Sequence, residues 1–276
     1  MNKTAIVSAT ATIPAHSQAR TLSINPGTPT TRTTPSPPAR QAVTKPDPNA
    51  RVIKYAAAVL KGQLHMMESI AACFISDNAR IKKHQDGWIL ESSEFAACTN
   101  GEEAFLIADD IVSRANCILA LYCGATSALS VEHIYWINAE GEELRQIRGS
   151  ISVNVVSSQG LADLKTMSGT QPLGSAVFQA MINDPAIWEA LDLYGESGLS
   201  WSQVYDIIEF FGIATIVKAG YSKTQTTRVR RTANHYRHLG NPNKPPLPAK
   251  PPTLIEASEF AASVLKRWIS SRLSSP

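Results

Sequence analysis

The chain has 276 residues, of which 43% are hydrophobic and 18% charged, and its mean hydropathy is −0.10. A chain of this composition can bury an apolar core, which excludes disorder throughout its length. It contains no apolar run of roughly 18 residues, so we expect no helix that spans a membrane and no membrane partner.

The cysteines give no sign of a metal site. Cys73, Cys98, Cys117 and Cys123 include no pair at zinc-ligand spacing, and no histidine stands at ligand spacing beside them. We therefore expect neither a metal nor a cofactor. The apolar stretch after Met1 is too short for a secretory signal, which favours a cytoplasmic protein with reduced thiols.

Charge is segregated along the chain. Residues 52–209 carry 9 basic and 20 acidic side chains, a net charge of −11, whereas residues 210–255 carry 8 basic side chains and no acidic one, a net charge of +8. A basic segment without acids can attract phosphate groups. It can equally pack near the acidic part of its own chain, or remain solvated.

Residues 1–50 are rich in Ser, Thr, Pro and Ala and show no apolar periodicity. Repeated prolines between residues 26 and 48 would interrupt any helix. The segment is therefore predicted to be a disordered tail with polyproline II character.

Residues 51–160 are predicted to form an α+β region that starts with a hairpin. The segment 63–75 fits either a strand or a short helix. Two extended runs, 79–84 and 88–92, flank a turn that contains Asp86-Gly87, which is a strong hairpin signal.

A long helix and a second hairpin follow in this region. Residues 101–123 repeat apolar side chains every 3.6 positions, and Gly124 is the predicted C-cap. The alternating run 131–137 is predicted to pair with 142–147, and residues 151–155 alternate as a further strand.

Residues 161–276 are predicted to be helical. Pro172 begins one helix, and Asp184-Pro185 is an N-cap with proline at the first helical position. Ser200 with Gln203 and Thr253 with Glu256 form two capping boxes. The predicted fold class is thus α+β: β-hairpins packed with a long helix, followed by a helical C-terminal half.

The basic segment 210–255 contains the candidate site. If residues 222–239 are helical, Val229, Ala233 and Tyr236 lie on a packing face. A second face of that helix would hold Arg228, Arg231, His235 and His238, which are spaced at offsets of 0, 3, 7 and 10 residues. The helix could break near Asn234, because the helix propensity of this segment is only fair. The candidate nucleic-acid-binding residues are Lys223, Arg228, Arg230, Arg231 and Arg237.

Histidine beside arginine can also act on a phosphodiester. A neutral imidazole accepts the proton of a ribose 2′-hydroxyl, and a guanidinium stabilises the charge that builds on phosphorus. The candidate catalytic residues are His235, His238, Arg230 and Arg231. Their spacing resembles the Arg-x4–6-His motif of the HEPN superfamily, which implies a metal-independent ribonuclease. That family usually places a polar residue, often Asn, directly after the arginine, whereas Arg231 and Thr232 occupy those positions here.

A second resemblance covers roughly residues 85 to 270. The motifs that carry it are, in order, Trp201-x3-Tyr205-Asp206-Ile207-Ile208-Glu209, Thr232-Ala233-Asn234, Arg237-His238 and Leu254-x-Glu256-Ala257. This order resembles a family of uncharacterised bacterial proteins. The resemblance implies one compact unit with the Thr-Ala-Asn sequence in a turn, and it implies no activity.

Three functions stay open at this point. The first is a binding or interaction module whose basic C-terminal helix contacts nucleic acid or an acidic partner. The second is a HEPN-like ribonuclease of the toxin or phage-defence type. The third is a structural role, in which the basic segment packs on the acidic body of the same chain.

Overall fold

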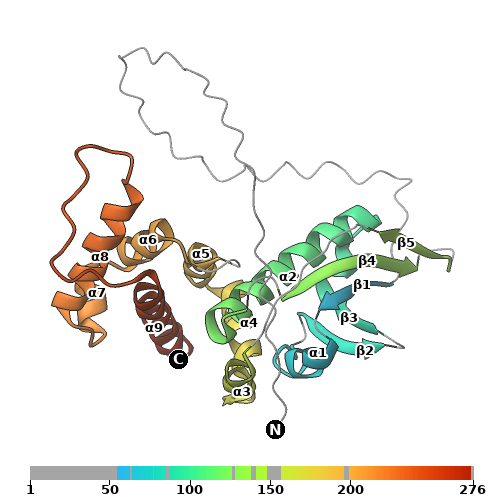
Figure 1. Ribbon diagram of the computed structural model, residues 1–276. Coiled ribbons are helices and arrows are strands. Elements are labelled where there is room, and N and C mark those ends of the chain that lie inside the picture. The colour runs from blue at the N-terminus through green and yellow to red at the C-terminus, as the bar shows by residue number, and fades with distance from the viewer. Residues whose placement is uncertain are drawn as a thin grey trace, which may run out of the picture. The chain divides into compact units, whose positions relative to one another are not determined.

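The computed structural model describes residues 55–62, 64–76, 78–84, 87–125, 128–137, 141–147, 157–195 and 199–274 (Figure 1). These residues belong to one compact unit that comprises residues 47–276. The predicted tail at 1–50 and the predicted strand at 151–155 lie outside the described residues.

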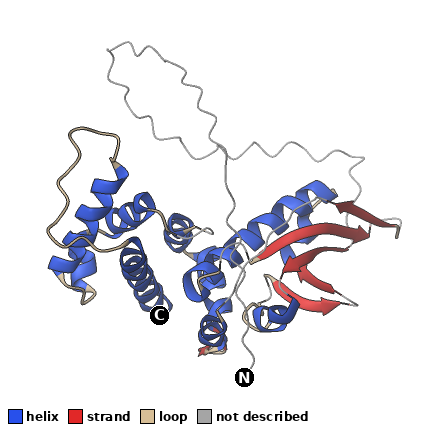
Figure 2. Cartoon of the chain, in the orientation of Figure 1, coloured by secondary structure: helices blue, strands red, loops and turns tan. Residues whose placement is uncertain are grey.

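Among the described residues, five antiparallel strands form a sheet that contains both predicted hairpins (Figure 2). The strand order is β2-β3-β1-β4-β5. In this order the strands are β2 (Arg80–His84), β3 (Gly87–Glu91), β1 (Tyr55–Gly62), β4 (Leu129–Ile137) and β5 (Glu143–Ile147). β2 pairs with β3, and β4 pairs with β5, so both hairpin predictions are confirmed and the fold is α+β.

The sequence patterns did not predict β1, the central strand. Its first half is a run of alanines, which favour helices and are depleted in strands. Ala57 and Ala58 are nonetheless fully buried, because β1 pairs with β3 on one side and with β4 on the other. Strand pairing therefore overrides local propensity at this position.

Helix α2 (Gly101–Cys123) has the predicted bounds. Its N-cap Asn100 accepts a hydrogen bond from the Glu103 N–H at 2.9 Å, and Gly124 ends it in the left-handed conformation with φ of 64°. The buried face of α2 packs on β1 and β4. Buried Asn116 joins α2 to the start of β4, because its side-chain amide bonds both the N–H and the carbonyl of Leu129 at 2.9 Å.

The segment 63–75 contains helix α1 (Leu64–Ala71), so the helical alternative is the correct one. A 3₁₀ helix, η1 (Ser93–Ala97), follows β3. The remaining elements lie C-terminal to the sheet. They are α3 (Ser158–Lys165), the short paired strands β6 (Met167–Ser168) and β7 (Gln171–Pro172), α4 (Leu173–Asn183), α5 (Pro185–Tyr194), α6 (Trp201–Phe211), α7 (Ile213–Lys218), α8 (Lys223–Arg237) and α9 (Leu254–Leu273).

Local capping signals predict the starts of α5, α6 and α9 correctly. Asp184 accepts a hydrogen bond from the Ala186 N–H at 3.1 Å at the start of α5. The reciprocal hydrogen bonds of both predicted capping boxes are present, Ser200 with Gln203 in α6 and Thr253 with Glu256 in α9. Helix α7, which follows α6 after Gly212 alone, was not predicted.

One apolar cluster joins the sheet to the C-terminal helices. It includes Ala58 of β1, Ile118 of α2, Leu191 of α5 and Leu265 of α9, all fully buried. The predicted α+β region 51–160 and helical region 161–276 therefore share a core. Within the described part of the chain, no helix has both the length and the apolar character needed to cross a bilayer.

All four cysteines are free thiols buried in the fold. Burial raises the pKa of Cys73 and Cys98 to about 11 and that of Cys123 to about 12. The described residues contain no cluster of three or more His, Cys, Asp or Glu side chains suited to a metal ion. The thiols of Cys73, Cys98 and Cys123 are therefore protonated at neutral pH.

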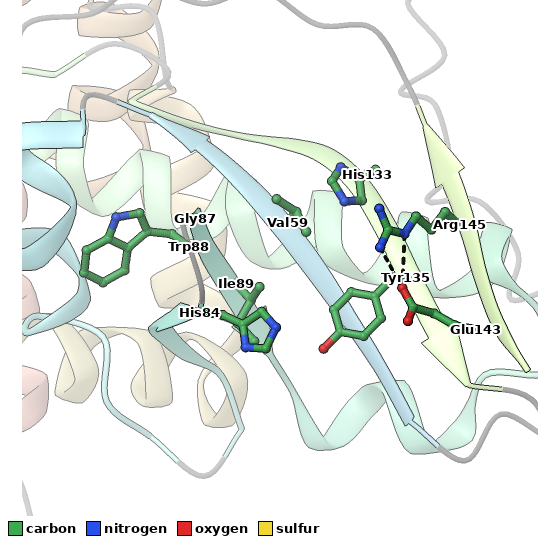
Figure 3. A pocket seen from close by; sticks show the side chains of 9 residues that line it. All are labelled: Val59, His84, Gly87, Trp88, Ile89, His133, Tyr135, Glu143 and Arg145. Atoms are coloured by element: carbon green, nitrogen blue, oxygen red, sulfur yellow. Dashed lines mark hydrogen bonds and ion pairs between the residues drawn. The ribbon is translucent and has the colours of Figure 1, made fainter. Parts of the chain in front are cut away.

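The sheet face opposite α2 contains a hollow of about 300 Å³ (Figure 3). Side chains alternate between the two faces of a strand, so Ala58 and Leu90 point toward the core, whereas Val59 and Ile89 face the hollow. His133 of β4 also lines this hollow.

Candidate anion-binding interface on helix α8

Helix α8 has the packing face that its sequence predicts. Val229 and Ala233 are buried, and α8 contacts α6 and α7. The Tyr236 ring stacks on Trp201 of α6 with 4.8 Å between ring centroids. These contacts fix the rotation of α8 and so decide where each of its cations points.

The helix continues without a break through Asn234 to Arg237. The break that the sequence left open near Asn234 does not occur. Thr232, Ala233 and Asn234 lie inside α8, so the turn that the family resemblance implied for them is wrong. Buried Thr232 is accommodated because its hydroxyl donates to the Arg228 carbonyl at 2.9 Å, one helical turn earlier.

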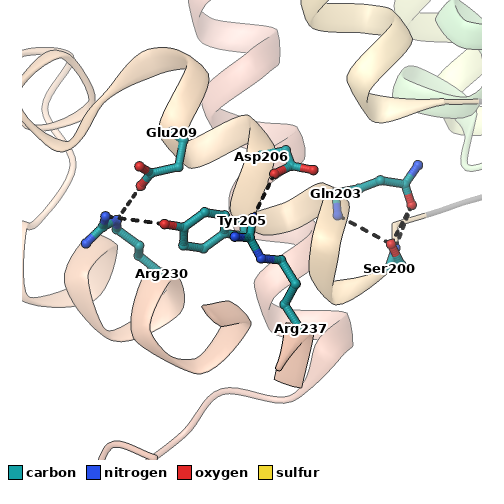
Figure 4. A network of polar contacts seen from close by, with 7 residues as sticks. All are labelled: Ser200, Gln203, Tyr205, Asp206, Glu209, Arg230 and Arg237. Carbon is teal, nitrogen blue, oxygen red and sulfur yellow. Dashed lines mark hydrogen bonds and ion pairs between the residues drawn. The ribbon is translucent and has the colours of Figure 1, made fainter. Parts of the chain in front are cut away.

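Arg230 and Arg237, which we call the inward pair, point toward α6 (Figure 4). The Arg230 guanidinium forms an ion pair with Glu209, and Arg237 bonds Asp206 at 3.2 Å. Both guanidinium groups lie over the Tyr205 ring, at 5.6 Å and 4.1 Å from its centroid. Carboxylates from the acidic region 52–209 thus neutralise two of the arginines that were predicted from the sequence to bind nucleic acid.

The Arg230–Glu209 contact affects the ionisation of both groups. The hydrogen bond from Arg230 holds the pKa of Glu209 below its usual value, and Glu209 raises the pKa of Arg230. Both side chains are more than one-third exposed, so solvent weakens the pair. The pair orients α8 on α6 more than it adds stability.

Lys223, Arg228 and Arg231, which we call the outer face of α8, are exposed. None of the three has an ion-pair partner among the residues that the structure describes. Arg228 lies close enough to Glu256 of α9 to lower the pKa of that carboxyl, after two larger contributions from Thr253. The outer face is therefore cationic, with one acidic side chain at its edge.

His235 lies one helical turn beyond Arg231 and is half-buried. Its Nδ1 lies 2.7 Å from the Pro245 carbonyl oxygen, in the loop between α8 and α9. Because a carbonyl only accepts, Nδ1 carries the proton, and in the neutral ring Nε2 holds the lone pair. The bond fixes both the tautomer and the orientation of this imidazole.

His238 is the C-cap of α8 and has left helical geometry, with φ of −111° and ψ of 29°. The predicted stack of Arg228, Arg231, His235 and His238 therefore holds within the helix only for the first three. His238 is half-buried. Of the predicted catalytic set, Arg230 is engaged by Glu209, whereas Arg231 and His235 share one strip of the helix surface.

The sequence analysis missed Tyr205, Asp206 and Glu209 as partners of α8. All three belong to one short stretch of α6. Asp206 and Glu209 are three residues apart, so they lie on the same side of that helix. Nothing local connects this stretch to residues 230 and 237, so no spacing rule could have paired them.

Comparisons of this chain with protein-family models, with curated proteins and with solved structures found no match.

Proposed function

We propose that this chain is a binding module whose outer face of α8, formed by Lys223, Arg228 and Arg231, holds an anionic partner, either nucleic acid or an acidic protein surface. One observation carries this proposal. The cations of α8 divide into an inward pair that carboxylates neutralise and an outer face without ion-pair partners in the described part of the chain.

Physical chemistry supports an anion at the outer face. Exposed guanidinium groups present planar forks of N–H donors that match phosphate and carboxylate oxygens. The run 210–255 contains no acidic residue, and Glu256 of α9 lies near Arg228 at the edge of this face. Contacts with phosphates release counterions, so binding through this face would weaken as salt increases.

Two double variants test the proposal with equal changes in charge. Arg228→Gln with Arg231→Gln alters the outer face, and Arg230→Gln with Arg237→Gln alters the inward pair. Affinity is measured by fluorescence anisotropy with a single-stranded RNA, a duplex DNA and a poly-glutamate peptide over a range of salt concentrations.

We expect the outer-face variant to lose about tenfold in affinity at low salt. The slope of the logarithm of its binding constant against the logarithm of salt concentration should decrease in magnitude by about 2. The inward variant should bind normally while it remains folded. Equal loss of binding in both folded variants contradicts the proposal. The probe that binds most tightly identifies the partner as nucleic acid or protein.

The metal-independent ribonuclease is a second candidate, which the Nδ1 contact of His235 favours. A histidine oriented by a carbonyl presents Nε2 as a general base, and Arg231 lies on the same strip of α8. RNA cleavage in the presence of a chelator should then fall at least about 100-fold in His235→Ala. Cleavage that survives this substitution contradicts the assignment.

A further inference from the structure

The sheet hollow brings together side chains that are far apart in the sequence. Val59 of β1 and Ile89 of β3 are cross-strand neighbours and form an apolar floor, and Ile89 is only 2% exposed. The walls are His84 of β2, His133 and Tyr135 of β4, and Arg145 of β5. Gly87, paired with His84, adds no side chain and leaves the floor open.

Two aromatic rings form a flat platform beside this floor. The rings of His84 and Tyr135 come from strands that β3 and β1 separate, yet their centroids are 6.4 Å apart and their planes differ by 20°. Both rings are seen nearly face-on in Figure 3, whereas Trp88 points away from them. Nearly parallel rings beside an apolar floor favour a planar ligand that can stack on them.

The polar groups next to the platform are balanced in charge. Arg145, the cross-strand neighbour of Tyr135, bonds Glu143 through two nitrogens at 2.8 and 3.1 Å. The two side chains are 64% and 52% exposed, so the pair is weak and a ligand can exchange with it. Arg145 and His133 provide hydrogen-bond donors, and Glu143 provides acceptors. This combination suits a heterocycle whose edge carries both hydrogen-bond acceptors and donors.

We propose that the sheet hollow binds a planar heterocycle of the nucleobase class. The ring would stack on His84 and Tyr135, and its polar edge would exchange hydrogen bonds with Arg145 and Glu143. A hollow of about 300 Å³ has the size of a site for one small ligand. The charge balance distinguishes this ligand from the anion assigned to the outer face of α8, and the two proposals share no residue.

The test is a titration of the full chain with guanosine, adenosine and ribose 5-phosphate, followed by NMR. We expect at least one nucleoside to bind with a Kd below about 1 mM and ribose 5-phosphate to bind at least tenfold more weakly. Tyr135→Leu should weaken nucleoside binding about tenfold, whereas Tyr135→Phe should retain it. Arg145→Gln, at an exposed position, should weaken binding without disturbing the core.

Lys83→Gln is the matched control, because Lys83 is exposed and adjacent to His84 but belongs to the opposite face of β2. Three results would overturn the proposal: no nucleoside binding, equal binding of ribose 5-phosphate, or equal loss in Lys83→Gln and Arg145→Gln. The outer-face variant Arg228→Gln with Arg231→Gln should bind nucleosides normally, which separates a failure here from a failure of the proposed function.

Discussion

Tyr205 organises the contact between α8 and α6. Its ring lies beneath the guanidinium groups of both Arg230 and Arg237, and its hydroxyl lies 3.5 Å from Arg230. Arginine stacks on aromatic faces better than lysine because its guanidinium is planar and weakly hydrated. A lysine at either position would keep the charge but lose the stacking and the fork geometry.

The Arg230–Glu209 pair should make stability depend on pH in one direction. Because the pKa of Glu209 is lowered in the folded state, its contribution is fully present above about pH 4.5 and is lost as pH falls through the lower folded value. We expect Arg230→Gln to reduce the free energy of unfolding by about 1 kcal/mol at pH 7. In urea titrations, the difference in free energy of unfolding between wild type and Arg230→Gln should become smaller below pH 4.5.

Arg231→Gln is the control for this measurement, since it removes the same charge from an exposed position of the same helix. Its stability should match wild type at every pH. A difference between wild type and Arg230→Gln that stays constant down to pH 3 would show that Glu209 does not carry the effect.

At the scale of elements, close backbone contacts fix how the helices pack. Helix α3 meets the last turn of α2 at Gly160, where an added Cβ would lie 2.3 Å from the Tyr122 carbonyl oxygen. Glycine costs about 1 kcal/mol relative to alanine within a helix. The close approach of the two backbones therefore explains glycine at a position where helix propensity alone favours alanine.

We expect Gly160→Ala to lower the free energy of unfolding by about 1–3 kcal/mol, because the clash involves backbone atoms that cannot rotate away. Gly240→Ala is the matched control, since its added Cβ meets nothing within 4 Å. Thermal unfolding followed by circular dichroism checks both variants. Equal melting temperatures for the two would refute this account of the α2–α3 contact.

At the scale of the whole molecule, the sheet and the C-terminal helices share one core. Fully buried Ile134 of β4 and Leu265 of α9 belong to the same apolar cluster, although they lie in different predicted regions. A shared core favours cooperative unfolding, because neither part can expose its inner surface without disrupting the other.

We therefore expect Ile134→Ala and Leu265→Ala each to destabilise the protein by about 2–5 kcal/mol while a single unfolding transition is retained. The measurement compares tryptophan fluorescence with far-ultraviolet circular dichroism during urea unfolding. Two separate transitions, with each variant shifting only one, would show that the regions unfold independently.

The sequence by itself determined the elements whose signals are local. The β2–β3 hairpin, the periodic run of α2 with Gly124, and the capping boxes at Ser200 and Thr253 involve residues a few positions apart. Their geometry follows from nearby side chains and backbone groups, so they could be predicted without knowledge of the fold. The α+β class followed from these elements.

Only the tertiary structure decided what the candidate residues contact. Helical spacing separated Val229 and Ala233 from Arg228 and Arg231, but it could not identify Glu209 and Asp206 as the partners of Arg230 and Arg237. The alanine-rich β1 and the meeting of His84 with Tyr135 likewise depend on strand pairing across the sheet. Such contacts join residues distant along the chain, and the free energy that favours them comes from burial and pairing in the assembled fold.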